Sequence, residues 1–482
     1  MKVLARLTVP LILAAAAIRL AGINCQLWLD EIWSIRLAQK AGFPLGVFTN
    51  PDLKHDNNHW LNTLYLLALG AGRPFWVYHL LPEVTGIGTV ILGYLLARKR
   101  GPGEGFCAVL LLGFCEFLIE YSSDARGYAP AGFFTLLGLF CLEKHLAQPR
   151  RVTALMMSAA GVLGVLSHLT FAVILAALGL ASLVALIRQK RGWVWPASQA
   201  MLWWAVPVTM LAMLYFVDVR HMVYGGGPPT PSDFPSQAAA MILGISPGSW
   251  LAPLLGLAAL VLCAAQLYRL YRANDAAFTF YLVVFLFVPG VLFLWPKSDY
   301  LHPRYVYVAV PPLLVLMAME LGGWLAKPQL PRFAAAALLA AFVLANVILT
   351  TRFLRLGRGD FTGALAALVD QTANPNIVVA ANEHPKSTLM VLQYYDGSAG
   401  PRLKPHRLLT LNTEQWGDHW PQWMIAENDY GLHVDTPNGV PFVRRGSFPK
   451  GAVTSGIAWT LYEVESRQPN VRPENLKLIP PQ

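Results

Sequence analysis

The sequence predicts a multi-pass α-helical membrane protein, with a membrane-embedded part over residues 1–350 and a small soluble α/β domain over residues 351–482. Three observations predict this fold class. Of the 482 residues, 55% are hydrophobic and 13% are charged, whereas soluble domains carry roughly 25% charged residues. Stretches of about 18 or more nearly uncharged residues recur along the first part, and that length crosses a hydrocarbon core of about 30 Å. The last third of the chain lacks such long apolar stretches.

The apolar stretches predict about eleven transmembrane helices. We expect them at residues 3–23, 74–97, 105–121, 127–146, 152–168, 170–188, 196–217, 244–268, 277–295, 305–325 and 332–350. Few ionisable residues lie inside these stretches. The first stretch also fits a signal peptide, because it joins a basic start to an apolar core.

The basic residues near the ends of these stretches predict the orientation. Six clusters fall on one side of the membrane if the helices alternate in direction. They are Lys2 with Arg6, Arg98 to Arg100, Lys144 with Arg150 and Arg151, Arg188 with Lys190 and Arg191, Arg269 with Arg272, and Lys327 with Arg332. Cytoplasmic loops are rich in Lys and Arg. We therefore expect a bacterial inner-membrane protein with a cytoplasmic N-terminus and a periplasmic C-terminal domain. This sidedness explains the formal net charge of +10 without a nucleic-acid partner.

The C-terminal third alternates helix-like and strand-like segments. Helices are expected at 361–370 and 387–395, and strands at 376–380, 423–427 and 457–464. Asp360 is expected to cap the first of these helices. None of the five cysteines lies in this part of the chain, so the sequence predicts no disulfide framework.

The unusual polar residues crowd into the loops expected on the outer side. The first outer loop, residues 24–73, carries the acidic pair Asp30-Glu31 and the sequence HDNNHW at 55–60. A second loop carries EYSSDARGY at 120–128, and a late loop carries WPKSDYLHPRY at 295–305. Ionisable groups near a membrane are costly, so this common sidedness indicates a functional site.

Each of these features also has a structural interpretation. Asp30 and Asp56 can be helix N-caps, with Glu31 interacting with the helix dipole. The aromatic residues can belong to the interfacial belt of a membrane protein. The basic residues of the later outer loops can hold lipid headgroups; these residues are Arg126, Lys297 and Arg304.

The histidines of the outer side leave two interpretations open. His55 and His59, four residues apart with Asp56 between them, can be metal ligands, although the sequence offers no clear third ligand. His168, at the end of the fifth predicted helix, is more typical of a packed polar residue.

Together these motifs resemble the GT-C superfamily of membrane glycosyltransferases, and within it the branch of protein O-mannosyltransferases and lipid A aminoarabinose transferases. That family opens with one span and an acidic pair, matched by Asp30-Glu31. The segment DNNHWL at 56–61 matches the second block of the family. The segment YSSDARGY at 121–128 matches the loop between its third and fourth spans, and PRY at 303–305 matches its late loop.

The sequence departs from the family pattern at two places. The HDNNH segment replaces a Pro-Pro form that is common in the second block, which leaves the acceptor open. Asp124 stands where many relatives carry Glu.

The resemblance implies transfer of a hexose or pentose from a polyprenyl-phosphate donor, such as undecaprenyl phosphate, to a hydroxyl of a glycolipid, polysaccharide or protein. The leaving lipid phosphate is doubly charged, and cations must receive it. Arg126 and Arg304 are the candidates, assisted by Lys297. A carboxylate must take the proton of the acceptor. By family position that is Asp30, with Glu31 orienting it or the acceptor.

The other polar side chains of the outer loops are expected to bind the sugar or the acceptor. They are His55, Asp56, His59, Asp124, Tyr128, His302 and Tyr305. A single displacement with one carboxylate as base implies inversion at the anomeric carbon. No metal and no other cofactor are expected.

Two other functions stay open. A lipid or sugar transporter would carry charged or helix-breaking residues inside paired spans near the midplane. An O-antigen polymerase or ligase would use a lipid-diphosphate donor, and the acidic pair directly after the first span argues against it.

Overall fold

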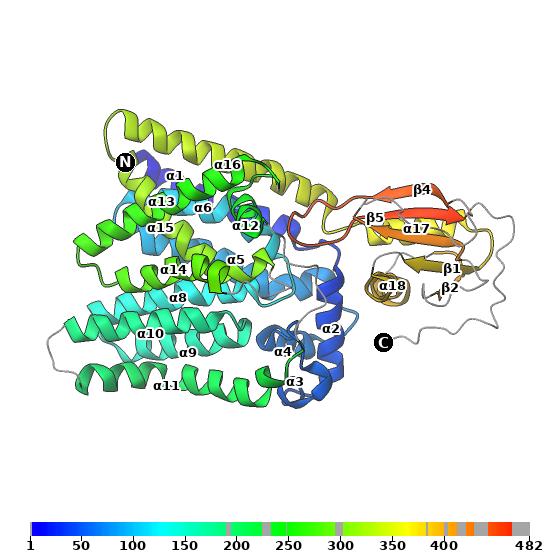
Figure 1. The fold of residues 1–482 in the computed structure, drawn as a ribbon, viewed down its shortest axis with the longest axis horizontal. Helices are drawn as coiled ribbons and strands as arrows, with labels where there is room; N and C mark the ends of the chain where they lie inside the picture. The colour runs from blue at the N-terminus through cyan, green and yellow to red at the C-terminus, as the bar shows by residue number, and fades with distance from the viewer. Residues whose placement is uncertain are drawn as a thin grey trace. The chain divides into compact units, whose positions relative to one another are not determined.

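The computed structural model describes residues 2–188, 194–223, 233–246, 248–294, 302–381, 384–399, 403–411, 421–428 and 442–464. The chain divides into two compact units, one mostly helical and one with a sheet (Figure 1). The first unit comprises Met1–Ile23, Ser34–Gly70 and Trp76–Thr350. The second unit comprises Asn24–Trp33, Ala71–Phe75 and Thr351–Gln482. The short segment that holds the acidic pair therefore belongs to the second unit.

A helix occupies each of the stretches predicted to span the membrane. These helices are α1 (Lys2–Gly22), α5 (Phe75–Arg98), α6 (Pro102–Phe114) with α7 (Glu116–Ser122), α8 (Tyr128–Ala147), α9 (Arg151–Ser167), α10 (Phe171–Arg188), α11 (Val194–Val217), α13 (Leu251–Arg272), α14 (Phe278–Leu294), α15 (Val310–Leu325) and α16 (Leu330–Leu356). In the described part of the chain, five helices are long and apolar enough to cross a bilayer, or six if α6 and α7 form one span. The multi-pass helical fold is confirmed, and the count of eleven stays a prediction.

The third predicted span is broken rather than continuous. Helices α6 and α7 meet at Cys115, whose backbone is extended, and their axes bend by 59°. Arg19 of α1 donates to the carbonyl oxygen of Gly113 at 2.8 Å, and the side chain of Asn346 accepts the first N–H of α7 at 2.7 Å. These bonds satisfy backbone groups that the break exposes, as the interior of a bilayer requires.

The eighth and tenth predicted spans begin differently from the sequence expectation. A separate short helix, α12 (Phe234–Leu243), ends at Gly244 in the left-handed conformation, with φ of 75°, so α13 starts only at Leu251. Glycine adopts this conformation without the strain that a side chain would add. The tenth span opens with a 3-10 segment, η3 (Pro303–Ala309), ahead of α15.

Short helices fill the first outer loop. They are α2 (Leu29–Ala41), α3 (Gly46–Thr49), η1 (Pro51–Leu53) and α4 (Trp60–Leu69). The carbonyl oxygen of Trp28 accepts the first bond of α2, from the N–H of Ile32 at 3.0 Å. Asp30 therefore lies inside the first turn, and its interpretation as an N-cap is wrong. Asp56 does not cap α4 either, because His59 holds the N-cap position.

Ion pairs gather the basic loops at one end of the first unit. Lys99, after α5, lies 2.6 Å from Glu143 near the end of α8. Arg100 lies 2.8 Å from Asp275 in the turn between α13 and α14. Loops that the charge pattern assigned to one side of the membrane thus do meet at one end of the helices.

The second unit is a small α/β domain, as predicted. Its strands are β1 (Asn376–Ala381), β2 (Arg407–Thr410), β3 (Trp423–Glu427), β4 (Phe442–Phe448) and β5 (Trp459–Val464), in the order β2-β1-β3-β5-β4. β1 is parallel to both its neighbours, whereas β5 is antiparallel to β3 and β4. Helix α17 (Phe361–Gln371) contacts β4 and β5, and α18 (Pro385–Tyr394) contacts β1.

The N-cap predicted for α17 is confirmed, because the Asp360 carboxylate accepts the Gly363 N–H at 2.9 Å. Strands β2 and β4 were not predicted. β2 has only four residues, and β4 reads FVRRGSF, which has no clear apolar alternation and shifts register between Arg444 and Gly446.

Candidate active site

Polar side chains from three loops meet at one end of the first unit. We call Asn57, His59, Arg126, Tyr128 and His168 the polar cluster. They come from the start of α4, the turn before α8, the start of α8, and the turn between α9 and α10. The cluster lies at the beginning of α8, and the ion pairs of the basic loops lie near its end. A helix of this length spans about 30 Å, which is the thickness of the hydrocarbon core.

Arg126 is held at the centre of the polar cluster. Only 3% of it is exposed, and its Nη2 donates to the amide oxygen of Asn57 at 2.6 Å. Asn57 donates in turn to the hydroxyl of Ser34 at 3.2 Å. The guanidinium carbon stands 5.1 Å from the ring centroid of Tyr128. A buried guanidinium fixed in this way is pre-organised to receive an anion.

His59 presents a hydrogen-bond acceptor inside the polar cluster. Its Nδ1 lies 3.2 Å from the carbonyl oxygen of Ser167. A carbonyl oxygen can only accept, so Nδ1 carries the proton and Nε2 is the acceptor of the neutral ring. Nε2 is buried and makes no hydrogen bond within the described residues. The ring centroids of His168 and Tyr128 lie 4.9 and 5.3 Å from that of His59.

The surroundings of His59 keep its ring neutral. Burial is the largest cause that lowers its pKa well below the usual value, and the charge of Arg126 is the next. His168 and Arg304 act in the same direction, whereas the bond to Ser167 opposes them. Two arginines from distant segments therefore act on one histidine, which places a second cation near the polar cluster.

The close approach of the loops depends on Gly127. A Cβ atom on this residue would stand 1.7 Å from the carbonyl oxygen of Ser167 and 3.0 Å from Nδ1 of His59. The side chain of Asn62 donates to the carbonyl oxygen of Ala125 and fixes the same turn. The small residue in the YSSDARGY motif thus allows Arg126 and His59 to come together.

Tyrosines form a wall behind the polar cluster. The ring of Tyr128 lies 4.8 Å from that of Tyr121 and 5.9 Å from that of Tyr307, measured between centroids. Tyr307, two residues after the PRY motif, was not predicted, because its apolar neighbours resemble the start of a span. Asp218, whose carboxylate accepts the indole N–H of Trp60 at 2.6 Å, was not predicted either.

The late outer loop is described from His302 onward. His302 caps η3 by accepting the Arg304 N–H on its Nδ1 at 3.3 Å. The Arg304 guanidinium carbon lies 5.7 Å from the ring centroid of Tyr305. His302 thus has a structural role as the cap of η3, and its role in binding stays a prediction. Lys297 lies outside the described residues.

The side chains of His55 and Asp56 contact each other. Nδ1 of His55 lies 2.7 Å from the Asp56 carboxylate, and the Asp56 N–H donates to the carbonyl oxygen of Val223. Residues 55–59 are not helical, so the spacing of His55 and His59 does not put them on one helix face. Asp124 is buried, and its carbonyl oxygen accepts the Arg126 N–H at 2.6 Å.

A metal site is not formed by the residues that the structure describes. Among them, no group of three or more His, Cys, Asp and Glu side chains is placed to hold an ion. The expectation of a metal-free protein stays a prediction.

The acidic pair is anchored within the second unit. The Glu31 carboxylate is buried and accepts the Trp28 N–H at 3.1 Å, which stabilises the start of α2. The hydroxyl of Tyr395 donates to the carbonyl oxygen of Leu27 at 2.7 Å. Asp30 is half-buried. It stays a prediction that the Asp30 carboxylate lies close to the polar cluster.

The fold of this chain has counterparts among solved membrane-protein structures. It is similar to ArnT from Cupriavidus metallidurans in the apo state, with a TM-score of 0.54, 11% identity, and coverage of 94% of this chain and 97% of that chain. The same protein bound to undecaprenyl phosphate gives a TM-score of 0.51, 12% identity and the same coverage. At this identity the similarity establishes the fold alone.

An oligosaccharyltransferase from Archaeoglobus fulgidus, in complex with Zn and sulfate, gives a TM-score of 0.45 at 13% identity, over 86% of this chain and 68% of that one. The sequence matches no family model and no curated protein.

Proposed function

We propose that this chain is an inverting glycosyltransferase that moves a sugar from a polyprenyl-phosphate donor to a hydroxyl acceptor at the periplasmic face of the inner membrane. The observation that carries the proposal is the polar cluster itself. It combines the buried guanidinium of Arg126 with the uncharged acceptor Nε2 of His59, and the charge of Arg304 acts nearby. A guanidinium binds a phosphate, and a neutral ring nitrogen accepts the hydrogen bond of a sugar hydroxyl.

In this proposal the arginines bind the lipid phosphate. The buried guanidinium of Arg126 carries paired N–H donors, and phosphate oxygens accept such donors in a bidentate way. ArnT, whose fold this chain shares, has been solved with undecaprenyl phosphate bound, which supports a donor of that class. Lys297 is proposed as a third cation from the late loop.

Asp30 is proposed as the general base. The acceptor O–H bond breaks and its proton passes to the Asp30 carboxylate as the oxygen attacks the anomeric carbon. The bond from that carbon to the phosphate oxygen breaks, and its electron pair stays on the phosphate held by Arg126 and Arg304. One displacement of this kind inverts the configuration. Glu31, buried at the start of α2, keeps the segment of Asp30 in place.

The remaining polar side chains are proposed to contact the sugar or the acceptor. His59 and Tyr128 lie in the polar cluster, where they are suited to sugar hydroxyls. The others proposed for these contacts are His55, Asp56, Asp124, His302 and Tyr305.

Reconstitution of the purified chain in liposomes tests this function. A panel of radiolabelled polyprenyl-phosphate sugars and crude envelope acceptors is supplied, and formation of labelled product is followed. Transfer of label with an inverted glycosidic linkage supports the proposal. Absence of transfer with every donor, in preparations that bind polyprenyl phosphate, would contradict it.

A transporter is the second candidate, and one observation favours it. The bent pair α6–α7 and the buried charges of Arg19 and Glu83 resemble the interrupted helices of transporters. In the described residues only one such pair is found, whereas transporter repeats carry two. The same liposomes discriminate the functions, because a transporter moves the labelled lipid across the bilayer without forming a new glycosidic bond.

A further inference from the structure

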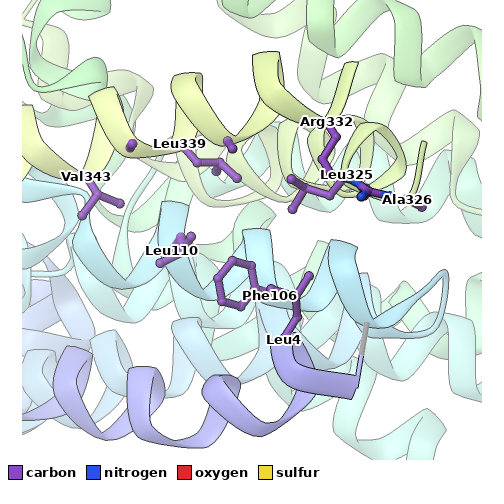
Figure 2. Close-up of a pocket in the computed structure, with 10 residues that line it drawn as sticks. Leu4, Phe106, Leu110, Leu325, Ala326, Arg332, Leu339 and Val343 are labelled. Carbon is purple, nitrogen blue, oxygen red and sulfur yellow. The ribbon is translucent and has the colours of Figure 1, made fainter. Parts of the chain in front are cut away.

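A groove of about 690 Å³ lies in the first unit, between α16 on one side and α6 and α1 on the other (Figure 2). Leu339 and Val343 of α16 face Phe106 and Leu110 of α6 across it. The lining residues are Leu4, Phe106, Leu110, Leu325, Ala326, Arg332, Ala336, Leu339, Ala340 and Val343. All of them are apolar except Arg332. The volume is in the range of small-molecule sites.

The groove is as deep as one leaflet of a bilayer. From Arg332 to Val343 helix α16 rises about 16 Å, about half of a hydrocarbon core of 30 Å. The Arg332 end lies beside the turn between α15 and α16, at the end of the unit that holds the basic loops. The polar cluster lies at the other end, so this groove is separate from the candidate active site.

The rim of the groove is apolar on the side of α16. Large apolar side chains on α16 are exposed beside it, with 78% of Leu330, 71% of Phe333 and 64% of Leu344 accessible. In a chain that spans a membrane, side chains of this kind contact lipid. An acyl chain can therefore enter the groove sideways from the bilayer.

The mouth of the groove is basic. The Nε of Arg332 donates to the carbonyl oxygen of Leu325 at 3.2 Å, which holds the side chain at the mouth. The terminal nitrogens of a guanidinium provide the paired donors that suit phosphate oxygens. Lys327 is exposed directly after the lining residue Ala326. None of the lining residues is acidic.

We propose that this groove binds one anionic phospholipid from the leaflet at the basic end of the protein, with an acyl chain between α16 and α6 and the phosphate on Arg332. The basic mouth complements a negatively charged headgroup, and the groove is as deep as the one leaflet that an acyl chain occupies. Both features favour an anionic phospholipid as the ligand. A polyprenyl donor does not fit as well, because its phosphate is expected at the polar cluster, on the opposite side of the membrane.

Native mass spectrometry of the purified chain in detergent tests the site without any measurement of sugar transfer. The protein is titrated with phosphatidylglycerol and with phosphatidylcholine that carries the same acyl chains. Arg332→Gln removes the charge at the mouth, and Ala340→Phe fills the groove. Arg272→Gln, at the exposed end of α13, and Ala337→Phe, on α16 outside the lining, are the matched controls.

We expect one tight phosphatidylglycerol site. Arg332→Gln should weaken it about tenfold or more, as loss of a charge-assisted hydrogen bond does, while phosphatidylcholine binding is unchanged. Ala340→Phe should weaken both lipids, and both controls should bind as the wild type does. Equal affinity for the two lipids with a silent Arg332→Gln would overturn the proposal. So would displacement of phosphatidylglycerol by polyprenyl phosphate, because the groove would then belong to the donor tail.

Discussion

Gln26 and Thr362 form a two-point contact inside the second unit. The amide oxygen of Gln26 accepts the backbone N–H of Thr362 at 3.1 Å, and its amide nitrogen donates to the Thr362 hydroxyl at 2.9 Å. The same oxygen accepts the N–H of Phe361 at 3.0 Å. The free N–H groups at the start of α17 are thus satisfied by a residue four positions before Asp30. The C-terminal unit therefore anchors the segment that carries the acidic pair.

Gln26→Leu should lower the turnover of sugar transfer by about 100-fold, while donor affinity stays within about twofold. Leucine keeps the size of the side chain but removes all of these bonds, and a displacement of about 1 Å in a reacting group can cost that much. The kcat and the binding of polyprenyl phosphate are measured in parallel. Gln371→Leu, at the exposed end of α17, is the control. Full turnover in Gln26→Leu would show that the contact is not needed for catalysis.

Gly127→Ala should weaken donor binding and lower the melting temperature. Its φ of −82° suits any residue, so the effect is purely steric and comes from the carbonyl oxygen of Ser167. Overpacking of this kind costs about 1–3 kcal/mol. Gly179→Ala is the matched control, because a Cβ there meets no atom within 4 Å. If both variants melt and bind alike, the close approach of the two loops does not matter.

His59 should make the folded state less stable at acid pH. Its pKa is lowered in the folded protein and returns to about 6.5 on unfolding. The unfolded chain then binds the extra proton, so stability falls as pH drops below about 6.5, by at most about 1.4 kcal/mol per pH unit. Thermal melting between pH 7.5 and 5.5 measures this loss. His59→Asn, which cannot titrate, should lose less, and an identical loss in both proteins would contradict the account.

The charge bias of the loops predicts that the second unit lies outside the cytoplasm. A reporter that fluoresces only in the cytoplasm, fused after Gln482, should be dark. The same reporter inserted after Gln148, in the turn between α8 and α9, should fluoresce. Fluorescence at both positions would contradict the periplasmic location of the second unit, and a fluorescent fusion after Gln482 with a dark insertion after Gln148 would reverse the sidedness of the polar cluster as well.

The helices could be predicted from the sequence, because apolar length is a local signal, whereas the sidedness of the loops stays a prediction. The break between α6 and α7 was not predictable in this way. The apolar run continues through Cys115 without a proline, and the residues that stabilise the break, Arg19 and Asn346, lie far away in the sequence.

The candidate site was predictable only in part. The YSSDARGY motif drew attention to Arg126 and Tyr128, and the HDNNHW motif to His59. Their partners in the structure, Ser167 and Tyr307, lie outside the motifs, although Tyr307 follows the PRY motif by only two residues. The spacing of His55 and His59 left a metal site open in the sequence, and in the structure the residues between them are not helical.

Binding of the lipid phosphate and transfer of the proton are assigned to different residues, and variants can separate them. Arg126→Ala should weaken binding of polyprenyl phosphate by about one to two orders of magnitude, because it removes a charge-assisted contact of roughly 1.5–3 kcal/mol. Lys386→Ala, on α18, serves as a control for the loss of one positive charge. Unchanged binding in Arg126→Ala would remove this arginine from the phosphate site.

The most direct test of the central claim is the turnover of Asp30→Asn with a polyprenyl-phosphate sugar, measured alongside its donor affinity. Asparagine keeps the size and much of the hydrogen bonding of the side chain but cannot take a proton. A general base contributes about 100- to 10,000-fold. We therefore expect turnover to fall by at least about 100-fold while donor affinity is unchanged. An Asp30→Asn protein that transfers sugar at the wild-type rate would contradict the account.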